Sequence, residues 1–241
     1  MKNSLIYYDV GAYRSPVFPF REKSHKKFFK KYVGIDPFFE KQYEAKGKYI
    51  YYGCAVSDEE GDRIFYLTPP FKKCRVSSSL YKPNEEVQGK RGVPFASLEG
   101  TKQVKCRKLS NIIKENGGDI DFLKIDAHGS EYPILKDIES YMDEMVGIQV
   151  ESWFYNCYHE VHLLDSVCDF FKKHSNFSLG MIFDEPKAFG DWACDLVYIN
   201  NNTNKVDKLN LIKKLYGIND DTIMKSEERI VSMLTKVIKY G

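Results

Sequence analysis

The sequence predicts an α/β fold with a mainly parallel central sheet and helices on both of its faces. Apolar, β-branched and aromatic runs of strand length alternate with amphipathic segments of helix length, which is typical of such sheets. The chain has 241 residues, of which 43% are hydrophobic and 15% aromatic. That is enough to bury the core of one domain of this class, so we expect one main domain.

Charge and cysteine content exclude several classes of protein. The 36 basic and 34 acidic residues leave a net charge of +2, which gives no chain-wide reason to expect nucleic acid or an anionic membrane as partner. The six cysteines form no CxxC or CxxH pair, so no obvious zinc ribbon is present. No apolar run approaches the roughly 20 residues that span a bilayer, and no signal-peptide pattern precedes the first strand. We expect a reduced, cytoplasmic protein with buried thiols.

In the first half of the chain, strands are predicted where β-branched and aromatic residues cluster. The first strand ends at Gly11, and a hairpin leads into a polar loop that contains Ser77, Ser78 and Ser79. In order, the expected elements are a strand at 4–10, a helix at 22–31, strands at 32–36, 48–58 and 62–68, and a helix at 105–118 that ends at Gly117-Gly118.

The second half continues the alternation. Ile134, Leu135 and Ile138 give one of its helices an apolar face. The expected elements are a strand at 120–126, a helix at 130–141, a strand at 145–152, a helix at 159–174 and a strand at 195–200. Two helical patterns follow, at 205–216 and 222–239, separated by Gly217 and an N-cap region at 219–221. We therefore divide the chain into a main domain at 1–203 and a C-terminal helical appendage at 204–241.

Carboxylates gather where the predicted strands end. Ligands of parallel α/β sheets bind at the carboxyl ends of the strands, so these ends mark the expected site. Asp9 and Gly11 close the first strand and Asp36 the second, 25 positions after Gly11, where an acid can grip the ribose hydroxyls of an adenosine. The turn lacks a full G-x-G-x-x-G motif, which disfavours a pyrophosphate cofactor. S-adenosylmethionine, an adenosine ligand without phosphates, fits better.

Five short motifs resemble, in order and spacing, those of the FkbM family of S-adenosylmethionine-dependent methyltransferases. The resemblance covers about residues 5–200, and its most specific part is the LKID-x-x-G-x-E block. The motifs are DVGA at 9–12, IDP at 35–37, AVSD at 55–58, SSSL at 77–80 and LKIDAHGSE at 123–131. The resemblance implies a Rossmann-like class I methyltransferase fold and methyl transfer, usually to a hydroxyl of a sugar or other small molecule.

The resemblance also implies roles for individual residues. Asp9 and Gly11 would shape the methionine pocket, Ala12 beside them would also bind the cofactor, and Asp36 would bind the ribose. Cys54 and Ala55 would lie beside the adenine, and Asp126 would stand near both the sulfonium and the acceptor. The chain departs from the family pattern in having Tyr13 where Asn is usual and His128 where Glu is usual.

The second departure suggests a catalytic role. Methyl transfer to a hydroxyl requires that the acceptor lose its proton as it attacks, and a nearby base assists this. Histidine can accept a proton near neutral pH, so we take His128 as the general base, with Asp126 orienting it or the acceptor. The plainer alternatives are that His128 only hydrogen-bonds a turn, that Asp126 caps a helix, and that Glu131 belongs to the first helical turn.

Two further questions stay open from sequence. FkbM-like enzymes are not expected to need a metal, so we predict none, although Asp126, His128 and Glu151 would suit a divalent cation if they converged. His159-Glu160-Val161-His162 lacks the spacing of a zinc motif and is assigned to the start of a helix. The expected partner is a small-molecule or glycan acceptor. The alternatives are a nucleic-acid or protein acceptor, and a non-catalytic binding module.

Overall fold

A computed structural model describes residues 4–13, 20, 23–70, 77–90, 97–183 and 192–240. An eight-stranded sheet forms its centre, in the order β10-β11-β9-β8-β1-β2-β4-β3. The strands are β1 (Leu5–Val10), β2 (Phe29–Ile35), β3 (Tyr43–Lys46), β4 (Tyr49–Tyr52), β8 (Phe122–Ile125), β9 (Gly147–Trp153), β10 (Phe177–Phe183) and β11 (Ala193–Asn200). Five strands in the middle of the sheet, β9, β8, β1, β2 and β4, run parallel to one another. At the two sides, β11 pairs antiparallel with β9 and β3 pairs antiparallel with β4. The predicted α/β fold with a mostly parallel sheet is confirmed.

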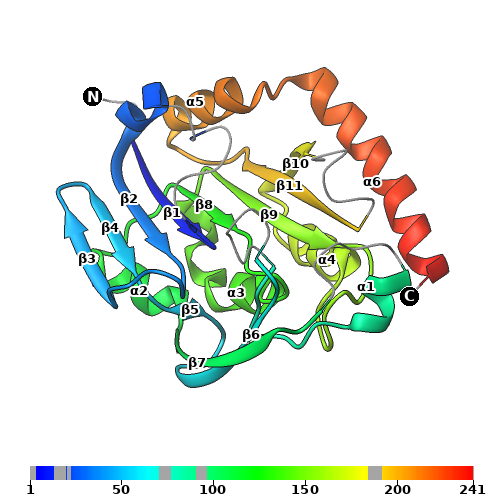
Figure 1. Cartoon of the computed structure of the whole chain (residues 1–241). Helices are drawn as coiled ribbons and strands as arrows, with labels where there is room; N and C mark the ends of the chain where they lie inside the picture. Colours follow the sequence, from blue (N-terminus) through cyan, green and yellow to red (C-terminus); the bar gives the residue numbers. More distant parts are fainter. Residues whose placement is uncertain are drawn as a thin grey trace.

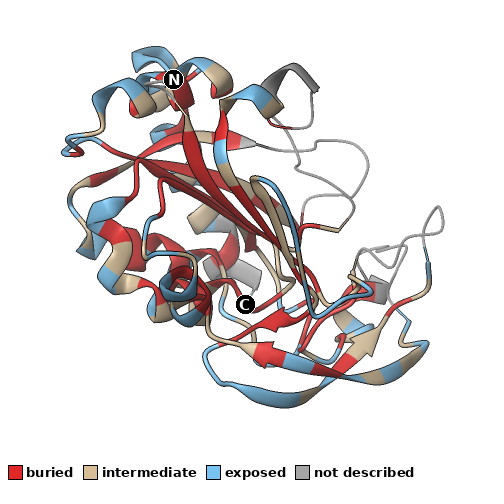
Figure 2. Ribbon diagram, turned by 90° about the vertical axis from the view of Figure 1, so that its left-hand side faces the viewer, coloured by how far each residue is buried: buried red, intermediate tan, exposed pale blue. Residues whose placement is uncertain are grey.

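Helices cover both faces of this sheet (Figure 1). One face packs against α2 (Leu109–Glu115), α3 (Glu131–Asp137) and α4 (Leu164–Lys173). The other packs against α5 (Val206–Tyr216) and the side chain of Phe20. The last helix, α6 (Asp220–Tyr240), packs on β10 and α4. Figure 2 shows the central strands buried between helices whose outer surfaces are exposed.

The strand β1 shows why the sheet lies in the middle. All six of its residues are buried, and successive side chains of a strand point to opposite faces. Tyr8 and Val10 enter the core under α2 and α3, whereas Leu5 and Tyr7 enter the core under α5. A strand buried on both faces reads as a continuous apolar run, as the sequence shows here.

A second, three-stranded sheet was not predicted. It has the order β5-β7-β6, with β5 (Ala55–Val56), β6 (Gly61–Leu67) and β7 (Gly100–Arg107). The predicted single strand at 48–58 is wrong. Strand β4 ends before Gly53, and the chain then passes from the large sheet to β5 of the small one. A Cβ at Gly53 would lie 2.3 Å from the carbonyl oxygen of Lys41, so this crossing requires glycine.

The predicted helix at 105–118 is also wrong in its first turn. β7 continues to Arg107, and α2 begins at Leu109. Val104 and Cys106 are buried while Lys105 is exposed, which is the period of two that marks a half-buried strand. The helix that follows ends before Gly117 and Gly118, as predicted.

Other element boundaries differ from the prediction. Instead of a helix at 22–31, a 3-10 helix, η1 (Lys23–Phe28), leads directly into β2, which buries Phe29. The helix expected at 159–174 begins only at Leu164, so His159 and His162 precede it. The helix expected at 130–141 ends early and is followed by a second 3-10 helix, η2 (Glu139–Glu144). A short helix, α1 (Glu85–Lys90), lies within the predicted polar loop, and β3 and β10 were not predicted.

The cysteines and the helices can be compared with two further predictions, of buried thiols and of no membrane span. Five of the six cysteines are free and buried, and Cys74 lies outside the described residues. Within those residues, no helix combines the length and apolar character that crossing a membrane requires.

Candidate active site

The carboxyl ends of the parallel strands surround one cavity. Its walls come from the turn after β1, the end of β2, the segment that joins β4 to β5, and the turn after β8. Most of the residues predicted for cofactor binding and catalysis line this cavity. They are Gly11, Asp36, Cys54, Ala55, Asp126 and His128.

Asp9 and Ala12, the other two predicted residues, are buried and do not line the cavity. The Asp9 carboxylate accepts a hydrogen bond from the Tyr32 hydroxyl at 2.9 Å and lies 3.6 Å from the Lys124 ammonium. Burial raises the pKa of Asp9 to about 6, against the opposing effect of Lys124. In this structure Asp9 therefore supports the cavity from behind, and any effect on a ligand passes through its neighbours.

Gly11 brings the ends of β1 and β8 together. Its φ of +78° lies in the left-handed region, and a Cβ built there would lie 1.9 Å from the carbonyl oxygen of Asp126. The amides of Gly11 and Ala12 both donate to the carbonyl oxygen of Ile35, at 2.9 and 3.2 Å. Only glycine permits this close approach, so the turn after β1 fixes the cavity floor through its backbone.

Asp36 is the one acidic group at the β2 end of the cavity. Its Oδ1 accepts a hydrogen bond from the Phe38 amide at 2.8 Å, and its side chain is buried. Burial raises the pKa of Asp36 to about 6, while the Phe38 amide and the Lys124 ammonium lower it. The surrounding wall is apolar and includes Phe38, Val56 and Phe65. One carboxylate beside an apolar slot suits a nucleoside, whose ribose is polar and whose base is flat and apolar.

Lys102 is a neighbour that sequence reasoning missed. Its ammonium donates to the carbonyl oxygen of Pro37 at 2.9 Å and lies 4.2 Å from the centre of the Phe38 ring. A cation over an aromatic face stabilises both groups, so Lys102 holds the Asp36–Phe38 segment against β7. The alternation of charged and apolar residues in β7 was the available signal, but these residues were assigned to a loop and a helix.

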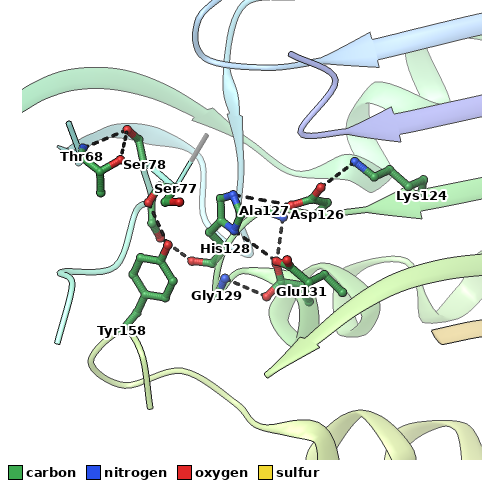
Figure 3. Close-up of polar contacts among 12 residues, drawn as sticks. Thr68, Ser77, Ser78, Lys124, Asp126, Ala127, His128, Gly129, Glu131 and Tyr158 are labelled. Carbon is green, nitrogen blue, oxygen red and sulfur yellow. Dashed lines mark hydrogen bonds and ion pairs between the residues drawn. The ribbon is translucent and has the colours of Figure 1, made fainter. Parts of the chain in front are cut away.

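At the other end of the cavity, His128 lies between two carboxylates. Its Nδ1 is 3.1 Å from Glu151 Oε2, and its Nε2 is 3.7 Å from Asp126 Oδ1. Figure 3 shows the ring beside Asp126, with Lys124 on the far side of that carboxylate. Burial lowers the pKa of His128, but the facing carboxylates outweigh this and raise it to about 10. The ring is therefore a cation at neutral pH in this arrangement.

The backbone of the His128 turn is held in an unusual conformation. His128 has a φ of +52°, which is uncommon for a residue other than glycine. Each carboxylate oxygen of Glu131 accepts a hydrogen bond from a backbone amide of the turn. The donors are the amides of Ala127 and Gly129, each at 2.8 Å (Figure 3). Glu131 begins α3 and is buried, so its expected place in the first helical turn is confirmed. It fixes the turn through both of its oxygens.

The Ser77–Ser79 segment also contacts the turn that contains His128. The Ser79 hydroxyl donates to the carbonyl oxygen of His128, and the Tyr158 hydroxyl donates to that of Ser77 at 2.8 Å. Ser78 lines the cavity. Two hydrogen bonds thus hold this segment beside the cavity.

A buried lysine joins the two ends of the cavity. Lys124 lies in β8 and is 1% exposed, with its ammonium 3.0 Å from Asp126 Oδ2 and 3.6 Å from Asp9 Oδ1. Burial alone would raise the pKa of Asp126, but Lys124 and His128 hold it below its usual range. Sequence reasoning missed this residue, although a lone lysine in the apolar run FLKI was a visible signal.

Trp153 and Trp192, whose aromatic faces are large enough to stack on a sugar ring, are 4% and 8% exposed. They pack with Cys157 and Tyr158 in a separate hydrophobic cluster. An indole ring buried in such a cluster cannot present its face to a ligand, so neither tryptophan offers a stacking surface for a sugar in this conformation.

Comparisons with known proteins place this geometry in context. Residues 9–179 match the family described as methyltransferase FkbM domain. A solved structure to which the chain is similar, methyltransferase FkbM from Methylobacillus flagellatus KT, is 14% identical and superposes with a TM-score of 0.49. That similarity covers 80% of this chain and 44% of the other, so the chain spans less than half of that protein. No curated protein matches.

Proposed function

The chain belongs to the FkbM methyltransferase family, and from that premise we propose that it transfers the methyl group of S-adenosylmethionine to a hydroxyl oxygen. The proposed acceptor is a sugar, a glycan or another small molecule. We also propose that residues 1–203 form a Rossmann-like class I methyltransferase domain, to which residues 204–241 add the helices α5 and α6.

The observation that carries the proposal is the placement of Asp36 and of Asp126 with His128 around one cavity. A buried carboxylate at the end of β2, next to an apolar slot, supports binding of the ribose and adenine of the cofactor. The wall of Asp126 and His128 supports placement of the reactive sulfonium and the acceptor near the end of β8. Cofactor and acceptor would then meet inside the cavity, as a direct displacement requires.

Two features of the chain support this cofactor over one that contains a pyrophosphate. Gly11 supplies a close backbone approach, and the sequence has no further glycines in the G-x-G-x-x-G positions. When bound, S-adenosylmethionine supplies an activated methyl group. The residues of the chain orient the acceptor: the Asp126 carboxylate can accept a hydrogen bond from its hydroxyl, and the protonated His128 ring can stabilise the negative charge that develops on its oxygen.

Binding of the cofactor tests the proposal first. We would titrate S-adenosylmethionine and S-adenosylhomocysteine calorimetrically into the full chain and into Asp36→Ala, with Asp207→Ala as control because Asp207 is exposed on α5. We expect saturable binding that Asp36→Ala weakens at least about tenfold, since a buried hydrogen-bonding carboxylate is lost, while Asp207→Ala binds like wild type. Absence of binding by folded wild-type protein would contradict the proposal and favour a binding module.

A further inference from the structure

Asp126, His128 and Glu151 bring three metal-binding side chains together at the cavity. One ligand atom from each lies within 4.8 Å of the other two, and all three side chains are partly accessible. Asp126 and His128 come from the turn after β8, and Glu151 comes from the neighbouring strand β9. Asp126 and His128 also line the cavity, so an ion held there would face a bound ligand.

We propose that these three residues bind a divalent transition-metal cation, and that the acceptor hydroxyl completes its coordination. This inference rests on the proposed methyltransferase function for the identity of the acceptor, but the metal site itself can be tested alone. Two carboxylates and one imidazole form a mixed oxygen and nitrogen set that suits cations such as Mn²⁺.

The three side chains lie close enough for one ion to draw their ligand atoms together, since those atoms are within 4.8 Å of one another. Ligand atoms that each lie about 2.1 Å from one cation are about 3 Å apart when adjacent and about 4.2 Å apart when opposite. His128 Nδ1 and Glu151 Oε2 are 3.1 Å apart, and His128 Nε2 and Asp126 Oδ1 are 3.7 Å apart. In the proposed complex the ion replaces the proton on one ring nitrogen, and side-chain rotation brings both carboxylates toward that nitrogen.

Neighbouring side chains fix the orientation of the proposed ligands. Glu131 uses both oxygens on backbone amides, which fixes the turn that presents His128. Lys124 contacts Asp126 through Oδ2, which leaves Oδ1 directed to His128. Carboxylates and imidazoles whose orientation is fixed by other hydrogen bonds bind metals more tightly than free ones.

A buried donor beside the cluster is a second observation. Glu151 and Trp153 are two residues apart on β9 and therefore project to the same face. The Trp153 ring lies 5.8 Å from the His128 ring, and its buried indole N–H has no hydrogen-bond partner within the described part of the chain. In the proposed complex, an oxygen bound to the cation, from water or from the acceptor, would supply the acceptor that this donor lacks.

The cation gives the acceptor a way to lose its proton. A coordinated hydroxyl is more acidic because the cation stabilises the negative oxygen, and its proton leaves to solvent. The oxygen then forms a bond to the methyl carbon while the carbon–sulfur bond breaks and sulfur keeps the electron pair. The cation is neither oxidised nor reduced. His128 would then act as a ligand, and the base role predicted from sequence would be unnecessary.

Binding of Mn²⁺ tests the site directly. We would strip the full chain with a chelator and follow Mn²⁺ binding by electron paramagnetic resonance for wild type, His128→Gln and Glu151→Gln. The matched control is His174→Gln, because His174 also faces a carboxylate, that of Glu139 at 3.2 Å, in a pair remote from the cavity. We expect one Mn²⁺ per wild-type chain, at least about tenfold weaker binding in both cluster variants, and no change in the control.

Several outcomes would overturn the metal site. These are no Mn²⁺ binding by wild type at millimolar concentration, or equal binding by all four proteins. If a cluster variant does not fold, the wild-type spectrum still decides: nitrogen hyperfine coupling from an imidazole is expected, and its absence would exclude His128. Titration of S-adenosylhomocysteine in chelator separates the two proposals. Cofactor binding without any Mn²⁺ binding overturns the metal alone, and the converse overturns the methyltransferase alone.

Discussion

The two halves of the cavity are built in different ways. The apolar half consists of Gly11, Asp36 and the wall around Phe38, and it has a single carboxylate and a backbone turn that only glycine can form. The charged half consists of Asp126 and His128, with Glu151 behind them, and is held by ion pairs and hydrogen bonds. This contrast separates the tasks: the first half is suited to holding a ligand, and the second to changing its charge.

The largest effect should come from the residue that joins the halves. Lys124→Met removes a buried ammonium that lies between Asp9 and Asp126, and breaking a buried ion pair at one partner costs about 3–5 kcal/mol. We expect this loss in the free energy of unfolding, measured by urea denaturation. Because Lys124 contacts Asp126 and also lowers the pKa of Asp36, cofactor binding and turnover should fall together.

A double variant sharpens this test. Asp9→Asn with Lys124→Met removes one of the two uncompensated carboxylates, so it should recover part of the lost stability. A Lys124→Met protein as stable as wild type would show that Lys124 does not join the halves. A double variant less stable than the single one would show that Asp9 is stabilised by other neighbours.

Much of the apolar half could be predicted from sequence because its signals are local. A glycine directly after a buried strand and an acid at the end of the next strand identify their own places in a parallel sheet, and Gly11 and Asp36 lie on the cavity as expected. Asp9 was placed at the correct strand end, but alternation of side chains directs its carboxylate to Tyr32 and Lys124. Sequence position alone does not reveal such partners.

The charged half was only partly predictable because its chemistry depends on pairing across strands. Asp126 and His128 were placed correctly at the cavity, yet the protonation of His128 depends on Glu151 in another strand. The three-stranded sheet was missed for a similar reason, since β7 pairs with β6 across more than 30 residues. Periodicity in a window of a few residues does not encode contacts at that distance.

The next largest effect should come from the turn of the apolar half. Gly11→Ala would place a methyl group 1.9 Å from the Asp126 carbonyl oxygen at a φ of +78°. Strain and displacement together should cost about 3 kcal/mol, seen as a lower Tm, and should weaken binding of S-adenosylhomocysteine. Gly117→Ala is the matched control because Gly117 has a φ of +96° but no atom within 4 Å of a Cβ.

The control should lose only about 1 kcal/mol, from backbone strain without a clash, and keep cofactor binding. Equal losses in the two variants would mean that the contact between the ends of β1 and β8 is unimportant. The turn would then matter only for its conformation, and the apolar half would not depend on its backbone approach to Asp126.

A change confined to the charged half should separate turnover from binding. His128→Gln keeps a polar side chain but removes both the charge and the metal-binding nitrogen geometry. We expect about 100-fold slower turnover, measured as S-adenosylhomocysteine formed with a panel of hydroxyl acceptors, and an affinity for the cofactor close to that of wild type. Unchanged turnover would remove His128 from the chemistry, and lost cofactor binding would show that the halves are not separable.

The smallest effect should come from protonation in the apolar half. Burial raises the pKa of Asp36 to about 6, so its carboxylate is ionised at neutral pH and becomes protonated as the pH falls through that value. A protonated Asp36 accepts hydrogen bonds from the ribose hydroxyls less well than the carboxylate does. Affinity for S-adenosylhomocysteine should therefore weaken about tenfold from about pH 7 to about pH 5. Lys124, Lys102 and Asp9 also act on Asp36, and the pKa of Asp9 is about 6 as well.

Asp36→Asn distinguishes these two carboxylates as the source of the pH dependence, because this variant should bind the ligand weakly at every pH and with a flat profile. A profile that stays steep in Asp36→Asn would assign the dependence to Asp9, and ligand affinity would then be set from behind the cavity as well as from its wall.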